Sequence, residues 1–160
     1  MMAQTFVFLK PDALKRKLKG NILQIIEEAG FKVEASKEVT VTKERILTHY
    51  DEVIHRLKSH DFVNSILEEF VGETVECMVL SHEGEAIHRM RELLGATNPA
   101  LAGANTIRGR YGNDSYEKAN EEGRMIQNLM HASDAEDTFQ RERALWFDDA
   151  GIQDTFEYDF

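Results

Sequence analysis

Residues 74–80 read TVECMVL, a mostly apolar run with the length of a strand that is buried on both faces. A second run of this kind, AQTFVFL, fills residues 3–9 and is stopped by Pro11. Between the two, residues 31–41 alternate apolar and polar side chains, as a half-buried strand does. These segments predict a sheet in which residues 74–80 form a central strand.

Apolar side chains at helical spacing flank the predicted strands. They indicate helices over residues 20–29, 43–57, 61–70 and 86–94. Toward the end of the chain, the sequence predicts a short helix over 114–122, a short strand over 125–130, and a helix to about 146 that starts at a Ser133–Glu136 capping box. The core order β-α-β-β-α-β predicts an α+β fold of ferredoxin-like type, with a four-stranded antiparallel sheet and helices.

Residues 95–113 and the C-terminal tail lie outside this regular pattern. The first segment holds several glycines and Pro99 without a clear period, and a loop of such length is usually functional or disordered. The tail from about residue 148 is acidic, and aromatic residues alternate at its end: Phe156, Tyr158 and Phe160. We expect one domain over residues 1–160, with the tail packed on its own subunit or on a neighbour.

Composition is typical of a globular protein of the cytoplasm. Hydrophobic residues make up 42% of the chain and charged residues 30%, and no apolar run approaches the roughly 18 residues of a membrane span. The first residues lack the features of a secretory signal, and the single cysteine, Cys77, cannot form an internal disulfide. The net charge of −10 disfavours nucleic-acid binding, so a bound nucleotide would need a local cluster of cations.

Among the six histidines, His131 has surroundings that suit chemistry on an anion. It lies between the predicted strand at 125–130 and the predicted helix start, where free backbone N–H groups favour negative charge. An imidazole titrates near neutral pH and is then partly a free nucleophile, and the same helix end would stabilise a phosphorylated ring. The alternative interpretation is a histidine that only contacts the end of its own helix.

Basic residues occupy places where an anion site is often built. Lys10 follows the predicted strand at 3–9, Arg91 precedes the long loop, and Arg108 lies within it. Transfer of a phosphoryl group requires neutralised oxygens, and arginine suits bidentate contact with them. The chain has neither a P-loop nor a G-x-G-x-x-G motif, and no zinc motif of paired cysteines or histidines. Taken one at a time, each basic residue is better explained as a solvated surface charge.

Short motifs follow one another along the chain: TFVFLKPDA at 5–13, HY at 49–50, GATNPA at 95–100, TIRGRYG at 106–112, NLMHASDAE at 128–136 and ALWF at 144–147. Together they resemble the nucleoside diphosphate kinase family over nearly the whole chain, from about Thr5 to Phe147. The N-x-x-H-x-S-D element at 128–134 is very specific. Its agreement with the upstream motifs makes a chance match improbable.

This resemblance implies a role for each matching residue. His131 would be the phosphorylated nucleophile, and Glu142 with Ser133 would hold and tune its imidazole. The nucleotide would be bound by Lys10, Tyr50, Phe62, Arg91, Thr97, Arg108 and Asn128, with Phe62 stacked on the base. Mg²⁺ would arrive with the nucleotide phosphates, because the protein itself supplies few ligands. Members of the family form dimers that assemble into hexamers or tetramers, so the resemblance also implies a homo-oligomer, with the hexamer favoured over a tetramer or a dimer.

The implied reaction is the reversible transfer of the terminal phosphoryl group from a nucleoside triphosphate to a nucleoside diphosphate. A ping-pong mechanism through a phosphohistidine on His131 divides this transfer into two chemically alike halves, so one site serves both. Lys10, Arg91, Arg108 and magnesium would stabilise the transferring group electrostatically. Stacking on Phe62 reads no base edge, because every base has a π face, and broad nucleotide specificity follows.

The chain departs from the common family pattern most clearly between Arg108 and His131, where it is longer. Within residues 112–124, an Asp114–Glu117 capping box and a stop at Gly123 predict a short helix. The insertion is either a tolerated surface feature, or a rim beside the nucleotide entrance or a contact between subunits. Residues 61–66 also lack the prolines that usually flank the stacking aromatic.

Other functions compete with this interpretation, because a fold alone does not fix an activity. A binding scaffold that has lost catalysis would be expected to lack His131 or one of the phosphate-binding cations, and all are present. A histidine phosphocarrier for protein partners needs no base stacker and no sugar-binding lysine. Phosphate exchange between ATP and another nucleoside diphosphate would separate these alternatives.

Overall fold

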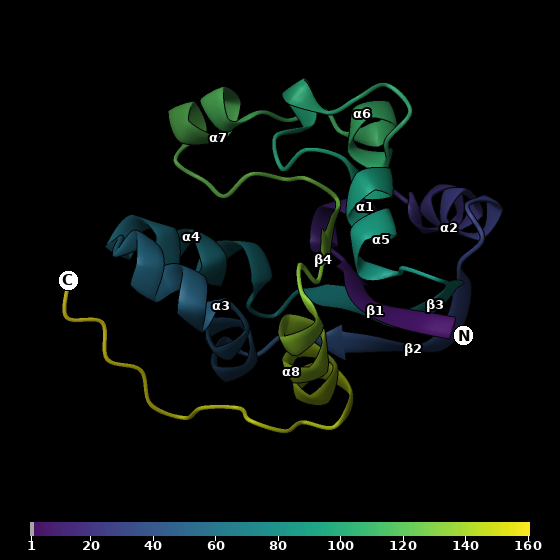
Figure 1. The fold of residues 1–160 in the computed structure, drawn as a ribbon. Helices are drawn as coiled ribbons and strands as arrows, with labels where there is room; N and C mark the ends of the chain where they lie inside the picture. Colours follow the sequence, from purple (N-terminus) through teal and green to yellow (C-terminus); the bar gives the residue numbers. More distant parts are fainter. Residues whose placement is uncertain (1) are drawn as a thin grey trace.

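The computed structural model describes residues 2–160, and one antiparallel sheet organises them (Figure 1). Its strands are β1 (Met2–Leu9), β2 (Lys32–Thr40), β3 (Thr74–Glu83) and β4 (Met130–Ala132). They lie in the order β2-β3-β1-β4, so β3 pairs on both sides, with β1 and with β2. The run TVECMVL is therefore an inner strand, as predicted, and the strand continues beyond it to Glu83.

Helices cover both faces of this sheet (Figure 1). One face carries α1 (Pro11–Lys15), α2 (Lys19–Glu28) and α5 (Ile87–Leu94). The other carries α3 (Lys43–Leu57), α4 (His60–Phe70) and α8 (Glu136–Phe147). Between α5 and β4 the chain forms η1 (Pro99–Leu101), α6 (Ile107–Tyr111) and α7 (Tyr116–Glu122). The predicted ferredoxin-like α+β fold is confirmed. Within residues 2–160, no helix combines the length and apolarity needed to cross a membrane.

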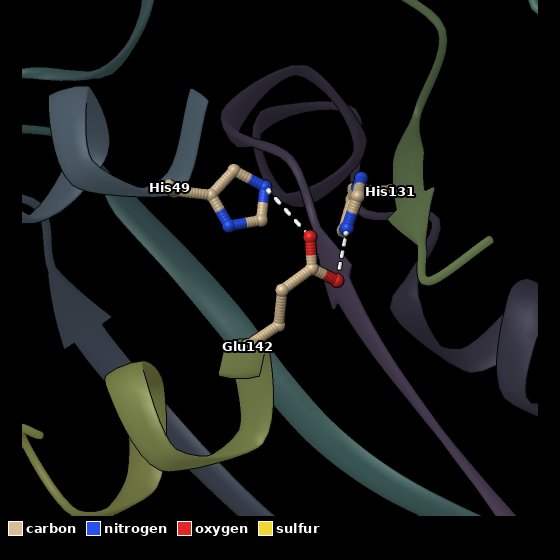
Figure 2. A group of neighbouring side chains, drawn as sticks. All are labelled: His49, His131 and Glu142. Carbon is tan, nitrogen blue, oxygen red and sulfur yellow. Dashed lines mark hydrogen bonds and ion pairs between the residues drawn. The ribbon is translucent and has the colours of Figure 1, made fainter. Parts of the chain in front are cut away.

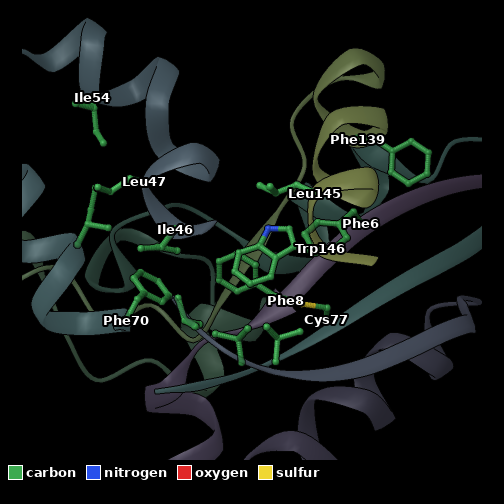
Figure 3. Close-up of a cluster of buried hydrophobic side chains, with 14 of the residues drawn as sticks. Phe6, Phe8, Ile46, Leu47, Ile54, Phe70, Cys77, Phe139, Leu145 and Trp146 are labelled. Carbon is green, nitrogen blue, oxygen red and sulfur yellow. The ribbon is translucent and has the colours of Figure 1, made fainter. Parts of the chain in front are cut away.

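Alternating side chains of the inner strands build a separate core on each face. Phe6 and Phe8 of β1 point toward α3, α4 and α8, where they pack with Phe70 and Trp146 (Figure 3). The side chains between them, such as Val7, point to the opposite face. Burying one such side chain contributes about 1.5–3 kcal/mol. The strand alternation therefore fixes which residues share the face that carries α8.

The strand predicted over residues 125–130 is wrong, because β4 begins only at Met130. Backbone carbonyls that precede β4 accept hydrogen bonds from side chains instead of pairing with a neighbouring strand. The carbonyl of Ile126 accepts a hydrogen bond from Lys10 Nζ at 2.9 Å, and the carbonyl of Asn128 accepts one from Arg108 Nε at 3.0 Å. Leu129 then takes a positive φ of 76° to redirect the chain into β4.

The capping box predicted at Ser133 and Glu136 is also wrong. Helix α8 begins at Glu136 with Ala135 at its N-cap, and no side chain caps it. Ser133 is fully buried, and its backbone N–H continues the strand pairing by donating to the Phe6 carbonyl at 3.0 Å. Its hydroxyl donates to Glu142 instead. The serine therefore belongs to the sheet and to Glu142, not to the helix start.

The long segment after Gly95 is more regular than its sequence suggests. Thr106 caps α6 by accepting a hydrogen bond from the Gly109 N–H at 3.0 Å. A helix follows in the insertion, as predicted, and it ends at Gly123 with a left-handed φ of 65°. Its N-cap is Ser115, which accepts from the Lys118 N–H at 3.1 Å, so the capping box expected at Asp114 is off by one residue.

The tail packs on its own subunit, which is the first of the two arrangements that the sequence left open. It runs alongside α3 and α4, and its aromatic side chains are partly buried against the core on that face (Figure 1). The Gln153 N–H donates to Thr48 Oγ1 at 2.9 Å, and the Tyr158 ring lies 5.6 Å from the His55 ring. The Phe160 ring ends beside His60, with ring centroids 4.9 Å apart.

Candidate active site

His131 lies on β4, opposite Phe8 of β1 in the sheet register. Its ring leans on the Phe8 ring, with centroids 5.0 Å apart, and 21% of its side chain remains exposed. The helix end that we expected beside it is farther along the chain, because α8 begins only at Glu136. A strand and an aromatic ring, rather than a helix terminus, position this imidazole.

The imidazole of His131 is oriented by Glu142 of α8. Its Nε2 lies 2.8 Å from Oε1 of Glu142, and its Nδ1 points away from that carboxylate (Figure 2). An ionised carboxylate can only accept hydrogen bonds, so this contact places the ring proton on Nε2. Nδ1 then keeps its lone pair. The carboxylate therefore selects the tautomer in which the outward nitrogen is a nucleophile.

Glu142 is held in its ionised form although only 3% of its side chain is exposed to solvent. Ser133 Oγ donates to Oε1 at 2.6 Å, and Oε2 lies 3.7 Å from Nε2 of His49. Burial raises the pKa of Glu142, but electrostatic attraction to the His131 and His49 rings and the hydrogen bonds from His131 and Ser133 outweigh burial and bring it to about 2. The carboxylate is therefore available to accept from His131 at neutral pH.

His49 on α3 completes this cluster, although no role was expected for it from the sequence (Figure 2). Its Nδ1 accepts a hydrogen bond from Trp146 Nε1 at 3.0 Å, which leaves the ring proton on Nε2, facing Glu142. Burial lowers the pKa of His49 to about 3, and Glu142 offsets this only in part. His49 is thus neutral at pH 7, and its Nε2–H group faces Glu142 as a dipole rather than as a positive charge. The sequence did carry a signal for this burial, because His49 lies one turn after Ile46 on the apolar side of a predicted helix.

His49, His131 and Glu142 are also the side chains within residues 2–160 whose possible metal-ligating atoms converge, all within 4.8 Å of one another. The hydrogen bonds already described account for this arrangement. Mg²⁺ prefers oxygen ligands, and here a single carboxylate is already engaged by His131 and Ser133. The cluster is therefore not an oxygen cage for magnesium.

Lys10 and Asn128 form a buried polar pair beside His131. Lys10 follows β1 and is 2% exposed, and its Nζ donates to Asn128 Oδ1 at 3.0 Å as well as to the Ile126 carbonyl. The amide of Asn128 donates in turn to the Thr97 carbonyl at 3.0 Å. Burial lowers the pKa of Lys10, and Asp12 is the strongest of the charges that oppose this effect. The pair thus joins the end of β1 to the segment that precedes β4.

Arg108 of α6 and Arg91 of α5 bring guanidinium groups to the same place. Arg108 donates to the carbonyls of Asn128, Gly95 and Met130, the last at 2.8 Å. Arg91 donates to the Ala132 carbonyl at 3.3 Å. Burial, together with the charge of the nearby Arg91, lowers the pKa of Arg108 to about 10. These backbone contacts fix positive charge at both ends of β4.

A cleft of about 1050 Å³ opens in front of His131, which is large enough for a drug-sized or nucleotide-sized ligand. Helices α3 and α4 form one wall, and α7 with the segment that follows it forms the other. The cleft is lined by His131, Glu142 and every residue predicted to bind nucleotide: Lys10, Tyr50, Phe62, Arg91, Thr97, Arg108 and Asn128. Ser133 lies behind the cleft, where it contacts Glu142.

Tyr50 and Phe62 stand on the wall formed by α3 and α4. Their rings meet edge to face, with centroids 6.3 Å apart. Phe62 lies in the first turn of α4, where Ser59 caps the helix by accepting from the Phe62 N–H at 3.1 Å. The absence of flanking prolines in the sequence therefore does not displace Phe62 from the cleft, because the Ser59 cap begins the helix at the required point.

Comparison with known proteins decides the family. The family model described as nucleoside diphosphate kinase matches residues 3–152. The chain belongs to the nucleoside diphosphate kinase family. It is an enzyme of phosphoryl transfer between nucleotides, as the motifs at 95–100 and 128–136 indicated. The nucleoside diphosphate kinase of Methanosphaera stadtmanae is 40% identical over 154 residues, which are 96% of this chain and 91% of that protein.

Solved nucleoside diphosphate kinases share the fold. The enzyme of Borrelia burgdorferi, a transition-state mimic with bound vanadate and ADP, superposes with a TM-score of 0.85 at 33% identity, over 99% of this chain and 94% of that one. The halophilic enzyme of Halobacterium salinarum, in complex with CDP, has a TM-score of 0.77 at 32% identity, over 98% and 95% of the two chains. The antiparallel sheet with its helices is thus the fold of this family.

Proposed function

We propose that this nucleoside diphosphate kinase works by a ping-pong mechanism in which Nδ1 of His131 carries the phosphoryl group. One observation carries the proposal: Glu142 accepts a hydrogen bond from Nε2, so that the free lone pair lies on the other ring nitrogen. That nitrogen belongs to a side chain lining a cleft that also holds Lys10, Arg91 and Arg108. The bound ADP and CDP of the Borrelia and Halobacterium enzymes support nucleotides as the ligands of this cleft.

The first half-reaction begins when Nδ1 attacks the terminal phosphorus of a nucleoside triphosphate. An N–P bond forms, the bond from that phosphorus to the bridging oxygen breaks, and the nucleoside diphosphate leaves with the electron pair. The Nε2 proton stays on the ring, where the Glu142 carboxylate stabilises the positive charge that develops. A terminal oxygen of a second nucleoside diphosphate then attacks the phosphohistidine, and the N–P bond breaks.

Fixed positive charge lowers the barrier to both halves. Lys10, Arg91 and Arg108 are held by backbone carbonyls or by Asn128 before any ligand arrives, so little reorganisation is needed during transfer. Tyr50 and Thr97 line the cleft where the sugar and phosphates would bind, and Phe62 offers its ring to the base. A stacked base is held through its π face, which supports broad nucleotide specificity.

Magnesium, by this proposal, enters with the nucleotide. Within residues 2–160 the convergent ligand atoms around His131 include one carboxylate, and it is already occupied by hydrogen bonds. Such surroundings suit an ion held mainly by phosphate oxygens, with waters completing its shell. When bound, the ion supplies neutralising charge to the phosphates.

We further propose a single domain over residues 1–160, a cytoplasmic location and a homo-oligomer, most simply a hexamer. The composition and the single, buried Cys77 suit a reducing compartment. The oligomer follows from the family to which the chain belongs. Light scattering of the purified protein measures its mass directly, and a monomeric mass would contradict the hexamer.

Labelling with γ-³²P-ATP tests the assignment of His131. The wild-type protein should acquire a label that is acid-labile and base-stable, as a phosphorylated imidazole is, and His131→Ala should acquire none. His88→Ala is the matched control, because His88 is exposed on α5 and pairs only with Glu92 within its own helix. Normal labelling and turnover by His131→Ala would refute the proposal.

A further inference from the structure

Helix α7 of the insertion turns one side toward the nucleotide cleft. The cleft-lining residues on this helix and its cap are spaced i, i+3, i+4 and i+7: Tyr116, Ala119, Asn120 and Gly123. Residues at this spacing share one face of a helix. The insertion is therefore a wall of the cleft with a defined face, and not a surface loop that happens to lie near it.

Charge is sorted between the two sides of α7. The residues outside the cleft-lining set are exposed and charged: Glu117, Lys118, Glu121 and Glu122. The cleft side carries only uncharged side chains, although the protein has a net charge of −10. A carboxylate facing a triphosphate would repel it, so this pattern is the one expected of a surface that meets an anion.

The insertion is held rigidly at its base. Asp114, with 3% of its side chain exposed, accepts both guanidinium ends of Arg124 at 2.7 and 3.0 Å. It also accepts the Gln127 N–H at 2.8 Å. Ala119 is 2% exposed and docks the helix on the body of the protein. The face of α7 is thus preorganised, which reduces the ordering cost of any contact it makes with a ligand.

Tyr116 is the largest side chain on this face, and 47% of it is exposed. It lines the same cleft as Arg108 and lies near enough to interact electrostatically with that guanidinium. Arg108 is the proposed phosphate ligand at the floor of the cleft. A phenol in this place is able to donate a hydrogen bond to an oxygen of the same ligand.

We propose that Tyr116 and Asn120 are nucleotide-binding residues, with the Tyr116 hydroxyl donating to an oxygen at the phosphate end of the ligand and the Asn120 amide contacting it from the next turn of α7. This inference rests on the proposed function, because it takes a nucleoside diphosphate or triphosphate as the occupant of the cleft. It adds a binding wall that the motifs of the family do not include.

Calorimetric titration with MgADP measures the contact without relying on turnover. Tyr116→Phe removes only the hydroxyl and should raise the Kd about threefold to tenfold, the usual effect of losing one hydrogen bond. Asn120→Ala should have an effect of similar size. Glu121→Gln is the matched control on the outward side of α7, and it should not weaken binding. Melting curves of each variant show that the fold is retained.

The possible outcomes distinguish failure of the α7 contact from failure of the proposed kinase mechanism. If Tyr116→Phe and Asn120→Ala both bind MgADP as the wild type does, while Arg108→Ala loses binding, the α7 contact is refuted and the proposed function stands. If Arg108→Ala also binds normally and His131 is not labelled by ATP, the proposed function itself is refuted. Weakening by Glu121→Gln equal to that of Asn120→Ala would show that the effect is not specific to the cleft face, and would also overturn the inference.

Discussion

The two faces of the sheet are packed with different kinds of side chain. The core beneath α3, α4 and α8 is dominated by aromatic rings, among them Phe6, Phe8, Phe70 and Trp146 (Figure 3). The core beneath α1, α2 and α5 is mainly aliphatic and includes Ile22 and Ile26. Both are well buried, yet His49, His131 and Glu142, the cluster at the candidate active site, lie on the aromatic side.

This difference shows what an aromatic core adds to burial. Trp146 fills space and also donates a hydrogen bond to His49, while Phe8 packs against the rings of both His49 and His131. Aromatic side chains have polar edges and, in tryptophan, an N–H group, so they can surround an imidazole without leaving it unpaired. Aliphatic side chains offer only volume. We therefore expect substitutions on the aromatic face to change chemistry and those on the aliphatic face to change stability.

Glu142→Gln should have the largest effect on activity. An amide can donate to Nε2 of His131 and so favour the tautomer whose proton lies on Nδ1, where attack is blocked. By analogy with other orienting carboxylates, we expect the rate of phosphorylation to fall on the order of a thousandfold, measured in a single turnover with γ-³²P-ATP. Glu136→Gln, on the exposed first turn of α8, serves as the control. A Glu142→Gln protein that phosphorylates at the wild-type rate would show that tautomer selection is unimportant.

Ile26→Ala tests the aliphatic face. Ile26 is fully buried on α2, so its truncation should lower the free energy of unfolding by about 3 kcal/mol through lost burial and the remaining cavity. Urea denaturation measures this loss. Because Ile26 lies across the sheet from His131, kcat at a temperature where the variant is folded should match that of the wild type. A large fall in kcat of the folded variant would erase the distinction between the two faces.

The pH dependence of stability should reveal the neutral, buried His49. Its pKa is about 3 in the fold, against 6.5 for an unperturbed histidine, so the unfolded chain binds a proton that the native state does not. Stability from this group is complete above pH 6.5 and is lost as the pH falls toward 3, on the order of 1 kcal/mol per pH unit.

His49→Gln should therefore flatten the loss of unfolding free energy between pH 6.5 and 5, measured by urea denaturation at several pH values. Glu142 contributes a loss in the same direction, but only below pH 4.5, because its pKa is lowered from that value to about 2. Equal slopes for the wild type and His49→Gln would mean that folding does not lower the pKa of His49.

Removal of the tail after Phe147 should have the smallest effect, a modest loss of stability. The deleted aromatic side chains are only partly buried against the aromatic core, so their loss should cost about 1 kcal/mol, or a few degrees in Tm. Differential scanning calorimetry measures this shift. Tyr158→Ala within the full chain should reproduce part of it. No change in either would show that the tail contributes nothing to the aromatic face.

The fold was predictable because its strands carry strong, local patterns. The runs at 3–9 and 74–80 and the alternation at 31–41 each specified a strand that the structure contains. The short strand β4 was misplaced, since Met125–Met130 has an equally apolar composition. Its boundary is set by distant partners: Lys10 and Arg108 take the preceding carbonyls, which leaves pairing with β1 to begin at Met130.

Many residues of the candidate cleft were named from the sequence, but His49 and the geometry of the site were not. Motif resemblance named the residues that line the cleft, because each motif places a recognisable side chain at a fixed position. Local sequence gave the wrong reason for His131, whose surroundings are set by Phe8 and Glu142 rather than by a helix end. His49 was missed because its role depends on contacts with Trp146 and Glu142, residues remote in the sequence.

The ion pair between Asp114 and Arg124 allows the length and sequence of the insertion to vary in evolution. Asp114 precedes α7 and binds Arg124 and the Gln127 N–H, which follow it. These contacts join the two ends of the insertion, so the path of the chain into β4 does not depend on α7 itself. Loop length above a closed base costs little, since closure entropy grows only logarithmically. Residues 115–123 can therefore be lengthened, shortened or replaced without moving His131, so the affinity of the cleft for its ligand can change in evolution while the chemistry is kept.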